Sequence, residues 1–473
     1  MNWSKWTVSV CTLGLSACAT PRVEQLRDNT DSLYAARSSL SLPSAPAHQY
    51  KESAWADFLT QPVDADAAVH IALLKNPRVT AIYSQLGLAR AELYDAARLS
   101  NPVLGYVGIT GSDARKTDWS VSQNFTELLF RRFRMAGAET QVLLTEQQVA
   151  QNLLDLEATV RAAHVRYVGS RTLASMRDRV ATSTRVAATY AQQLFDAGNV
   201  SKLQLARMQE AADLAQTDLV RARAAETADR NALLTLLGLA SGEPITFVGD
   251  YALPRAELPE IADVRAWALE NRLDLLSARE ALRFASVADT HTRRWRWLGE
   301  TTIGVAAEKD GTYGGFAAQT LVGPSASLAI PIFNQGTGSV DRAHATVEVL
   351  TSDVKALELS IGNEIATRVA ALGAARESVA LYREKLVPVQ RTIVEESQRQ
   401  QNYMLIGAFD LLAAKQHQYE GYEAYVGAVR DYWLAYVELI RATGGRYPQW
   451  KPGSEQQRVE PLAAIEASPG ERP

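Results

Sequence analysis

The sequence contains very little cysteine and no long hydrophobic run. Its two cysteines, Cys11 and Cys18, lie near the N-terminus, so the main body of the chain has no pair that could form a disulfide. Beyond the first 17 residues there is no stretch of about 18 apolar residues, which excludes a transmembrane helix there. If the chain crosses a membrane, it must therefore do so as strands of a closed barrel.

An excess of one charge is also lacking. The chain has 49 basic and 53 acidic residues, and the resulting net charge of -4 gives no electrostatic reason to expect a nucleic-acid partner. The six histidines are scattered without metal-ligand spacing, and we find no nucleophile elbow, phosphate-binding loop or paired acids. We therefore expect no enzyme, no cofactor and no metal site. The hydrophobic content of 47% excludes a largely disordered chain.

The N-terminus has the pattern of a secretory signal, with a short apolar run that ends in small residues. This run ends in Leu15-Ser16-Ala17-Cys18, which resembles the lipobox of bacterial lipoproteins. We expect residues 1–17 to be removed as a lipoprotein signal peptide and Cys18 to carry the lipid. The alternative is a cysteine that falls there by chance. The resemblance also implies that Ala19, which is not an aspartate, does not retain the protein at the inner membrane.

Composition divides the rest of the chain into a body and two flanking segments. Residues 18–62 are rich in Ser, Pro, Ala and charge, which predicts a mostly extended N-terminal arm. The similar composition of residues 448–473 predicts a loose C-terminal tail. The body between them consists of two structural repeats, residues 63–250 and 263–447, joined by a linker of residues 251–262.

The two repeats are related by an internal duplication. Each match is weak alone, but four matches in the same order over roughly 200 residues indicate a duplication. The matching positions are residues 72–77 with 268–273, Leu129-Phe130 with Ile332-Phe333, residues 205–209 with 412–416, and Gly238 with Gly445.

Apolar residues recur at alternating steps of three and four over very long stretches, which is typical of coiled helices. Examples are Val149, Leu153 and Leu156 in the first repeat and Val347, Leu350, Val354, Leu357, Ile361, Leu372, Val379 and Leu386 in the second. The uninterrupted pattern of residues 136–195 predicts a helix of about 90 Å, which no compact globule needs. Each repeat reads as helix, two strands, very long helix, tight turn and long helix.

The strand candidates are residues 102–110, 119–125, 301–308 and 325–330. Three of them alternate cleanly between an apolar face and a small or polar face, as strands between lipid and a water-filled lumen do. A soluble hairpin with one buried face is the alternative. Four strands alone would leave two open edges in lipid, so transmembrane strands would require a barrel shared between subunits.

On these features the chain is similar to the TolC family of outer-membrane efflux proteins, over residues 63–447. The resemblance implies a mainly α fold with a small β part: a trimeric TolC-like α-barrel of long coiled helices, joined to a shared 12-stranded transmembrane β-barrel with four strands per protomer. The motifs that carry it are Ala72-Leu73-x-x-Asn76-Pro77, Asn101-Pro102-Val103-Leu104, Ala197-Gly198-x-x-Ser201-x-Leu203, Leu236-Leu237-Gly238, Ile330-Pro331-Ile332-Phe333-Asn334-Gln335-Gly336 and Pro388.

The resemblance further implies the outer-membrane channel of a tripartite efflux pump. A homotrimer, lipid-anchored at Cys18 in the outer membrane and extending into the periplasm, would conduct substrates passively. Its partners would be outer-membrane lipid, a periplasmic adaptor protein and an inner-membrane pump. The alternative is a lipid-anchored periplasmic coiled-coil scaffold without a pore. The sequence does not indicate the substrate, because the duct lies downstream of the pump that selects it.

The turns of residues 196–200 and 402–407 are the expected periplasmic tips, where the resemblance implies adaptor contact. The contact residues would be Gly198, Asn199, Leu405, Ile406 and Gly407. Gly198 is also a natural terminator of a helix. That these are turns without a partner is the alternative.

Asp410 falls where family members place an aspartate of the periplasmic aperture, and Gln204 is its equivalent in the first repeat. Three copies of Asp410 would form an acidic ring that favours cations. The alternative is a residue near a helix N-terminus favoured by the helix dipole. Pro388 lies inside the second long helix and should kink it, and the first repeat has no proline there.

The membrane-interface belt is expected to include Trp119, Trp295 and Trp297. The latter two belong to Arg293-Arg294-Trp295-Arg296-Trp297, which precedes the third strand. Tryptophan rings sit at the membrane interface and arginine side chains can reach lipid headgroups. The run is therefore expected at the periplasmic rim of the membrane.

Overall fold

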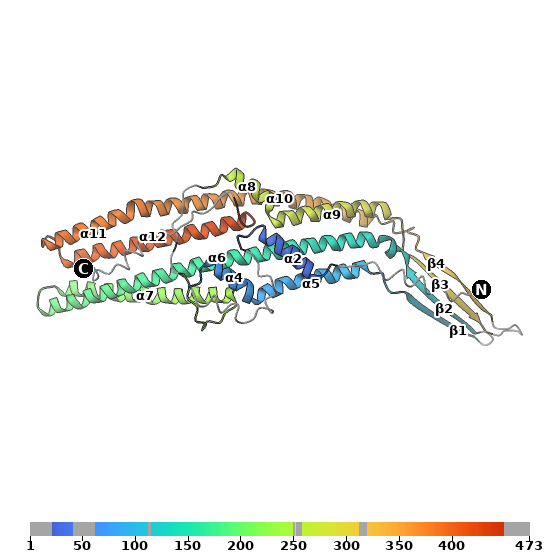
Figure 1. The fold of residues 1–473 in the computed structure, drawn as a ribbon, viewed down its shortest axis with the longest axis horizontal. Helices are drawn as coiled ribbons and strands as arrows, with labels where there is room; N and C mark the ends of the chain where they lie inside the picture. Colours follow the sequence, from blue (N-terminus) through green and yellow to red (C-terminus); the bar gives the residue numbers. More distant parts are fainter. Residues whose placement is uncertain are drawn as a thin grey trace. The chain divides into compact units, whose positions relative to one another are not determined.

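The computed structural model describes residues 21–40, 62–111, 115–248, 251, 258–311 and 319–448. The expected signal peptide, Cys18, most of the N-terminal arm and nearly all of the C-terminal tail lie outside these residues. The described elements, labelled in Figure 1, are α2 (Val23–Ala35), α4 (Ala65–Lys75), α5 (Pro77–Ala97), β1 (Val103–Thr110), β2 (Arg115–Asn124), α6 (Phe125–Asp196), α7 (Lys202–Leu237), α8 (Ile261–Asn271), α9 (Leu273–Trp295), β3 (Thr301–Asp310), β4 (Thr320–Leu328), α10 (Thr337–Leu381), the π-helix η3 (Tyr382–Leu386), α11 (Val387–Asn402) and α12 (Ala408–Ala442).

The element order repeats, as the internal duplication predicts. Two helices, two strands, a very long helix and a long helix occur first from α4 to α7 and again from α8 to α12. The predicted single helix before the strands is, however, two consecutive helices in each repeat. They are separated at Asn76 and at Arg272, whose ψ angles of 119° and 125° are extended. Pro77 explains the first break, because a residue before proline avoids the helical region.

A side-chain hydrogen bond joins each of these breaks to the last helix of its repeat. Asn76 Nδ2 donates to the carbonyl of Leu236, near the end of α7, at 2.8 Å. In the second repeat Arg272 Nη1 donates to the carbonyl of Ala442, at the end of α12, at 3.1 Å. The two repeats thus make the same joint with different side chains, and the second joint forms without a proline.

The glycine match between the repeats needs a shift of one residue. Gly238 ends α7 in the left-handed conformation, and the next amide, of Leu239, donates to Leu234. In the second repeat the corresponding amide is that of Gly445, which donates to Ile440. Gly444, with a φ of 81°, is therefore the equivalent of Gly238, because each of them lies one residue before that amide.

The chain divides into two compact units, and each contains parts of both repeats. One unit, here called the sheet unit, contains Met1–Ser32, Tyr83–Ala150 and Leu273–Glu358. The other, the hairpin unit, contains Leu33–Ile82, Gln151–Arg272 and Leu359–Pro473. The sheet unit therefore holds all four strands with the helical segments next to them, and the hairpin unit holds α7, α11 and α12.

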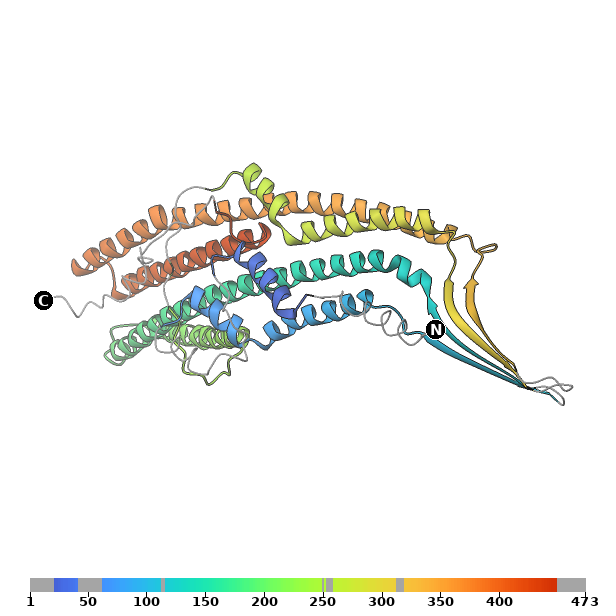
Figure 2. The ribbon, with the colours of Figure 1, turned by 45° about the vertical axis from the view of Figure 1, so that its right-hand side comes forward.

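The long helices match their apolar patterns. The 72 residues of α6 correspond to a helix of about 110 Å. Its expected apolar positions, including Val149, Leu153 and Leu156, are buried. Figure 2 shows β2 running directly into this helix. In α10 the stripe residues Val354, Ile361, Leu372 and Val379 are buried, whereas Val347, Leu350 and Leu357 are half-buried. Leu386, which continues the stripe in η3, is exposed.

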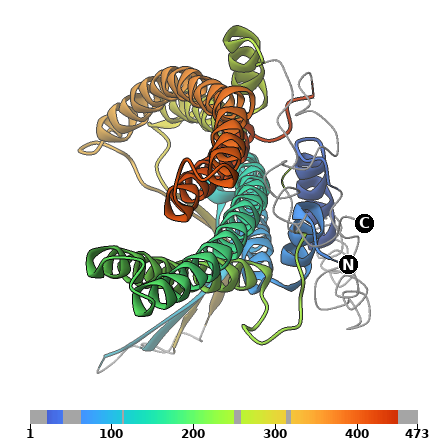
Figure 3. The ribbon, with the colours of Figure 1, turned by 90° about the vertical axis from the view of Figure 1, so that its left-hand side faces the viewer.

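The hairpin unit contains two antiparallel helical hairpins. In Figure 3 α6 and α7 lie side by side as one hairpin, and α11 and α12 form the other. Directly before Pro388 the helix changes to the five-residue π-helix η3, in which the amide of Val387 bonds to the carbonyl of Tyr382. The α-helical hydrogen bonding is thus interrupted where the proline predicts it, because proline has no amide proton to donate.

The four strands form one antiparallel sheet in the order β1-β2-β3-β4. β1 and β3 agree with the predicted strands, while β2 begins at Arg115, four residues earlier than expected. β4 spans Thr320–Leu328 and not residues 325–330, so the prediction for this strand was shifted. Pro324 does not end the strand, because it belongs to an outer strand of the sheet, where proline is tolerated.

The prediction of a mostly extended N-terminal arm is wrong over Val23–Ala35, which form helix α2. Its buried side chains are Leu26, Thr30 and Tyr34, spaced by four residues. Tertiary bonds hold the end of this segment in the hairpin unit, where the Tyr34 hydroxyl donates to Glu157 at 2.7 Å and Ser38 donates to the same oxygen at 2.8 Å. The helix thus depends on partners distant in sequence, which composition does not reveal.

No helix within the described ranges is both long and apolar enough to cross a membrane.

Candidate functional site

The register of the sheet gives it two chemically different faces. Val103, Ser122, Gly304 and Ser325 lie opposite one another across the four strands, so they share one face. This polar face carries mostly small, polar and charged side chains on three of its strands: Lys116, Asp118, Ser120, Ser122 and Asn124 of β2, Thr302, Gly304, Ala306, Glu308 and Asp310 of β3, and Gly323, Ser325 and Ser327 of β4. Its exposed apolar members are Leu321 of β4 and Val103, Val107 and Ile109 of β1.

The opposite face is apolar over the middle of the four strands. Its apolar members are Leu104, Tyr106 and Gly108 of β1, Trp119 and Val121 of β2, Ile303, Val305 and Ala307 of β3, and Val322, Pro324, Ala326 and Leu328 of β4. The same face carries polar or charged side chains toward the strand ends: Thr110, Arg115, Thr117, Gln123, Thr301, Lys309 and Thr320. The large side chains among the apolar members are all exposed. A contiguous exposed apolar surface of this kind marks contact with lipid or with another protein. The alternation that the sequence predicts is therefore confirmed for β2, β3 and β4.

The charges of the polar face gather toward the ends of the strands that are far from the helices. Lys116 Nζ lies 2.6 Å from Glu308 Oε1, and both side chains remain partly exposed. Asp118 lies directly opposite Glu308 in the register. The polar face therefore combines hydroxyl-bearing side chains near the helices with ionic side chains near the hairpin turns.

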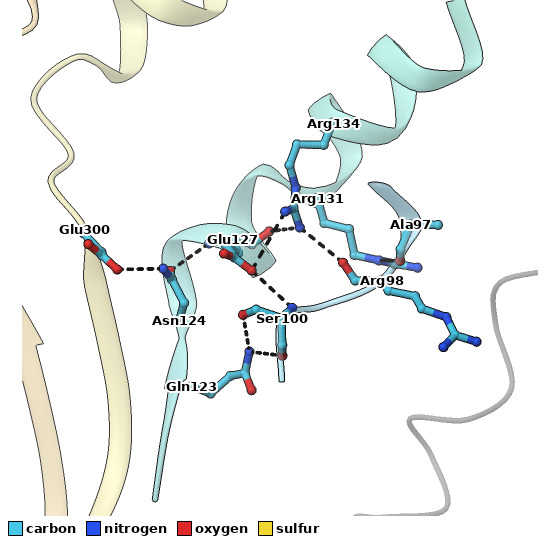
Figure 4. Close-up of polar contacts among 9 residues, drawn as sticks. All are labelled: Ala97, Arg98, Ser100, Gln123, Asn124, Glu127, Arg131, Arg134 and Glu300. Carbon is cyan, nitrogen blue, oxygen red and sulfur yellow. Dashed lines mark hydrogen bonds and ion pairs between the residues drawn. The ribbon is translucent and has the colours of Figure 1, made fainter. Parts of the chain in front are cut away.

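A set of hydrogen bonds fixes the junction where strands meet helices in the sheet unit (Figure 4). The Asn124 Oδ1 accepts from the amide of Glu127 at 3.1 Å, so Asn124 caps the start of α6. Glu127 in turn accepts from the amide of Ser100 at 3.2 Å. Asn124 Nδ2 also donates to Glu300, which precedes β3, at 3.0 Å. Asn124 therefore connects the end of the β1–β2 pair with the start of the β3–β4 pair.

Two more bonds reinforce this junction (Figure 4). Gln123 Nε2 donates to the carbonyl of Ser100 at 3.0 Å, and Arg131 Nε donates to the carbonyl of Ala97 at 2.7 Å. The sequence analysis missed these residues. Their signal was the spacing of Asn124 and Glu127, which is that of a capping residue followed three positions later by an acid.

The three expected belt tryptophans lie in different surroundings. Trp119 is near the middle of β2, on the apolar face, with its ring 4.7 Å from that of Tyr106. Trp295 ends α9 and packs edge-on against Phe130 of α6 at 5.7 Å. Trp297 is half exposed, and the guanidinium of Arg296 lies 4.5 Å from its ring centre. Trp297 thus combines an exposed ring with an adjacent cationic side chain.

An exposed apolar segment after β4 was missed as a surface feature. Ile330, Ile332 and Phe333 are exposed, and Phe333 is 100% accessible. The amide of Ile332 bonds to the carbonyl of Ile330 at 2.9 Å, which forms a tight turn around Pro331. The sequence analysis used these residues only as a motif.

The two helical tips have the same backbone. At the first tip the amide of Asn199 bonds to Leu194 and Gly198 has a φ of 75°. At the second, the amide of Leu405 bonds to Gln400 and Met404 has a φ of 60°. The predicted tip residues Gly198, Asn199, Leu405, Ile406 and Gly407 all lie in these two turns.

The second tip also exposes two apolar residues that the prediction omitted. Met404 is 92% exposed, and its neighbours Tyr403 and Leu405 are 73% exposed. The position equivalent to Met404 in the first tip is a glycine. The geometry of the two turns aligns Met404 with Gly198, whereas the sequence match of residues 205–209 with 412–416 would align Gly198 with Leu405.

Both candidate aperture residues cap helices. The side chain of Gln204 accepts from the amide of Ser201 at 3.4 Å, and Ser201 accepts from the amide of Gln204 at 3.2 Å. Asp410 Oδ2 accepts from the amide of Gly407 at 2.9 Å. Both residues are therefore the third residue of a helix and bond back to its first turn. Asp410 remains exposed, so its second oxygen is accessible to solvent.

A charged cluster connects three helices of the hairpin unit. Arg177 of α6 lies 2.7 Å from Glu423 of α12 and 3.2 Å from Asp218 of α7. Burial raises the pKa of Glu423 to about 7, although Arg177 opposes this shift. The sequence did not predict this cluster, because its members are far apart in the chain and no spacing relates them.

Comparison with solved structures places this architecture among outer-membrane channels. The Campylobacter jejuni CmeC outer membrane channel aligns with 88% of this chain and 91% of its own, at 14% identity and a TM-score of 0.67. The Vibrio cholerae outer membrane protein VceC aligns with 80% and 96%, at 13% identity and a TM-score of 0.66. The open state of the Neisseria gonorrhoeae MtrE outer membrane channel aligns with 80% and 88%, at 16% identity and a TM-score of 0.61.

No family model matches the sequence. The structural agreement nevertheless extends over at least 80% of this chain in each of the three comparisons. The mainly α architecture with a small antiparallel sheet, which the resemblance in the sequence predicts, is confirmed. The chain therefore has the fold of the TolC-family outer-membrane efflux channels.

Proposed function

We propose that the protein is the outer-membrane channel of a tripartite efflux pump. The observation that carries this proposal is the sheet, which has one polar face, one exposed apolar face and two outer strands. Such a sheet suits a wall between lipid and water. The fold shared with CmeC, VceC and MtrE, which are outer-membrane proteins, supports the same conclusion.

The channel is a homotrimer in this proposal. Among the described strands, β1 and β4 each pair on one side only, so one chain in lipid would leave two rows of backbone groups without partners. Each such group costs several kcal/mol in a bilayer. Three chains that pair β1 with β4 around a ring remove every edge and produce a barrel of about 12 strands.

The other regions of the chain have the following places in the proposed channel. The apolar face contacts outer-membrane lipid, and Trp297 with Arg296 lies at the periplasmic rim. Trp119 and Trp295 contribute to the interface belt, and Cys18 carries the lipid anchor. The long helices extend into the periplasm as an α-barrel, which passes substrates on passively without catalysis.

The two tips form the contact with a periplasmic adaptor, which connects the channel to an inner-membrane pump. Gly198, Asn199, Leu405, Ile406 and Gly407 are the proposed contact residues. The exposed apolar pair Tyr403 and Met404 adds the anchoring side chains that protein interfaces use. Three copies each of Asp410 and Gln204 line the aperture near these tips.

Two measurements test the proposal. Full-length protein is extracted from outer membranes and run on gels with and without heating, and the purified protein is then added to planar bilayers. A channel runs as a heat-sensitive trimer and conducts ions, at least once its aperture is opened. A monomer that is released from membranes by mild washing and never conducts would instead establish the periplasmic scaffold without a pore.

A further inference from the structure

The backbone of β4 has a defined orientation relative to β3. The amide of Asp310 bonds to the carbonyl of Gln319 at 3.1 Å, and the amide of Ala329 bonds to the carbonyl of Glu300 at 2.9 Å. In an antiparallel ladder, hydrogen-bonded and non-hydrogen-bonded pairs alternate along the strand. Pro324 is an odd number of residues away from both Gln319 and Ala329, which form hydrogen-bonded pairs. It therefore forms a non-hydrogen-bonded pair with Val305, and its nitrogen points away from β3.

Pro324 thus lies at the centre of the outer edge of β4. The residues whose backbone groups face this edge are the even-numbered ones: Thr320, Val322, Pro324, Ala326 and Leu328. Four of them present an amide proton to a neighbouring strand, and the middle one presents none, because proline has no amide proton.

The same alternation defines the outer edge of β1. The amide of Gly311 bonds to the carbonyl of Arg115 at 2.7 Å, so odd-numbered residues of β2 face β3 and even-numbered ones face β1. Through the register of β1 with β2, the residues of β1 that face outward are Leu104, Tyr106, Gly108 and Thr110.

These two edges complement each other. Outward-facing residues of both strands carry their side chains on the apolar face of the sheet. A ladder between β4 of one chain and β1 of a second copy therefore keeps the apolar face continuous only when even-numbered residues pair with even-numbered residues. A slip by one residue would turn every side chain of the added strand to the wrong face.

We propose that Pro324 is an assembly determinant of the seam between subunits, which leaves one inter-strand hydrogen bond unmade at the middle of each seam. The partner is β1 of a second copy of this chain, so the inference rests on the proposed trimeric channel. The carbonyl of β1 that faces Pro324 receives no backbone donor. Because it lacks this donor, the edge of β4 is also a poor template for any other strand before assembly, and proline on edge strands commonly has this effect.

Substitutions of neighbouring residues test the role of Pro324, because each changes one defined amide. Full-length trimers are extracted from outer membranes, and the temperature at which they dissociate is measured. Pro324→Ala supplies the missing donor and should raise this temperature by several degrees. Ala326→Pro removes the next outward donor and should lower it. Ser325→Pro removes a donor that faces β3 and should abolish the folded sheet itself.

Refolding provides a second readout, namely the oligomers that the chain forms, which does not depend on a dissociation temperature. When the denatured chain is diluted into detergent, Pro324→Ala should yield a larger fraction of oligomers other than the trimer. A Pro324→Ala trimer that dissociates at or below the wild-type temperature, with no rise in other oligomers, would overturn the inference. A wild-type chain that forms no trimer at all would instead contradict the proposed channel.

Cysteine pairs identify the occupant of the edge. Tyr106→Cys is combined in turn with Val322→Cys, Ala326→Cys or Leu328→Cys, and with Leu321→Cys, Gly323→Cys or Ser325→Cys as matched controls. We expect cross-links between chains for one or two even-numbered partners and for none of the odd-numbered ones. Cross-links that form equally well with odd-numbered positions would show that β1 of a second copy does not pair with this edge as inferred.

Discussion

Met404 and Gly198 occupy the same place in the two helical tips, with φ angles of 60° and 75°. The left-handed conformation costs a residue with a side chain roughly 1 kcal/mol, whereas glycine adopts it freely. Met404→Gly should therefore raise the free energy of unfolding by up to about 1 kcal/mol. Chemical denaturation of the detergent-solubilised protein measures this change.

Gly198→Met is the matched control at the other tip, and it should lower stability by a similar amount. If Met404 anchors the adaptor, Met404→Gly should weaken adaptor binding although it stabilises the fold. A variant that is less stable than the wild type would contradict the equivalence of the two tips.

Glu423 predicts a specific dependence of stability on pH. Its pKa is raised from 4.5 to about 7, so between these values the folded chain binds more protons than the unfolded chain. The contribution of Glu423 to stability is therefore fully present below about pH 4.5 and is lost as pH rises through about 7, by at most roughly 3 kcal/mol. Glu423→Gln should flatten this part of the pH profile of thermal unfolding.

Glu420→Gln provides the control, because Glu420 lies on the same helix but its side chain is 65% exposed. This variant should leave most of the slope in place. Equal slopes in the wild type and in Glu423→Gln would show that Glu423 keeps an ordinary pKa through its contact with Arg177.

The start of α12 combines a structural role with a proposed functional one. Asp410→Ala removes both the cap and the charge, whereas Asp410→Asn keeps an oxygen that can accept from Gly407. Loss of the cap should cost about 1 kcal/mol of stability in the alanine variant only. An acidic aperture predicts that both variants lose cation preference in planar bilayers.

Gln204→Ala serves as the control for the cap in the first repeat, where no charge is removed. It should lower stability while the cation preference stays the same. If the two Asp410 variants also conduct with unchanged selectivity, Asp410 is a helix cap and not part of an ion gate.

Sequence patterns predicted the elements well where one chemistry dominates a long stretch. The apolar stripe of α6 extends over many turns, so its position does not depend on any single residue. β4 was misplaced by several residues and contains Pro324, and only the position of this strand at the outside of the sheet makes the proline harmless. Helix α2 was missed because the prediction for residues 18–62 rested on composition, which does not reveal bonds to distant residues such as Glu157.

The contacts of the functional residues could not be predicted from the sequence. Asp410 and Gln204 were placed at equivalent positions correctly, but their capping bonds needed the geometry of the turn. The cluster of Arg177, Asp218 and Glu423 brings together three helices, and no local spacing announces it. Residues that act together across helices could therefore be found only in the folded chain.

At the scale of the whole molecule, the orientation of the sheet in a membrane makes the sharpest prediction. Val305 and Ala306 are neighbours in β3 on opposite faces. Val305→Lys places a charge on the lipid-facing side and should cost about 2–4 kcal/mol near the middle of the bilayer. Ala306→Lys faces the lumen and should be tolerated.

The yield of heat-sensitive trimer in isolated outer membranes measures both variants. We expect a large loss for Val305→Lys and a nearly normal yield for Ala306→Lys. The reverse order would mean that the sheet is turned the other way. Equal yields would mean that neither face meets lipid.

The joint between the first and last helices of each repeat has a consequence for evolution after duplication. In the first repeat a neutral amide, that of Asn76, makes the bond to the helix end. In the second repeat the bond comes from Arg272, which is also paired with Glu364 at 2.6 Å. Added salt should therefore loosen the joint of the second repeat more than that of the first, because ions screen a charged pair but hardly affect an amide bond. Two copies that began identical have kept a common geometry while acquiring different sensitivities to the ionic medium.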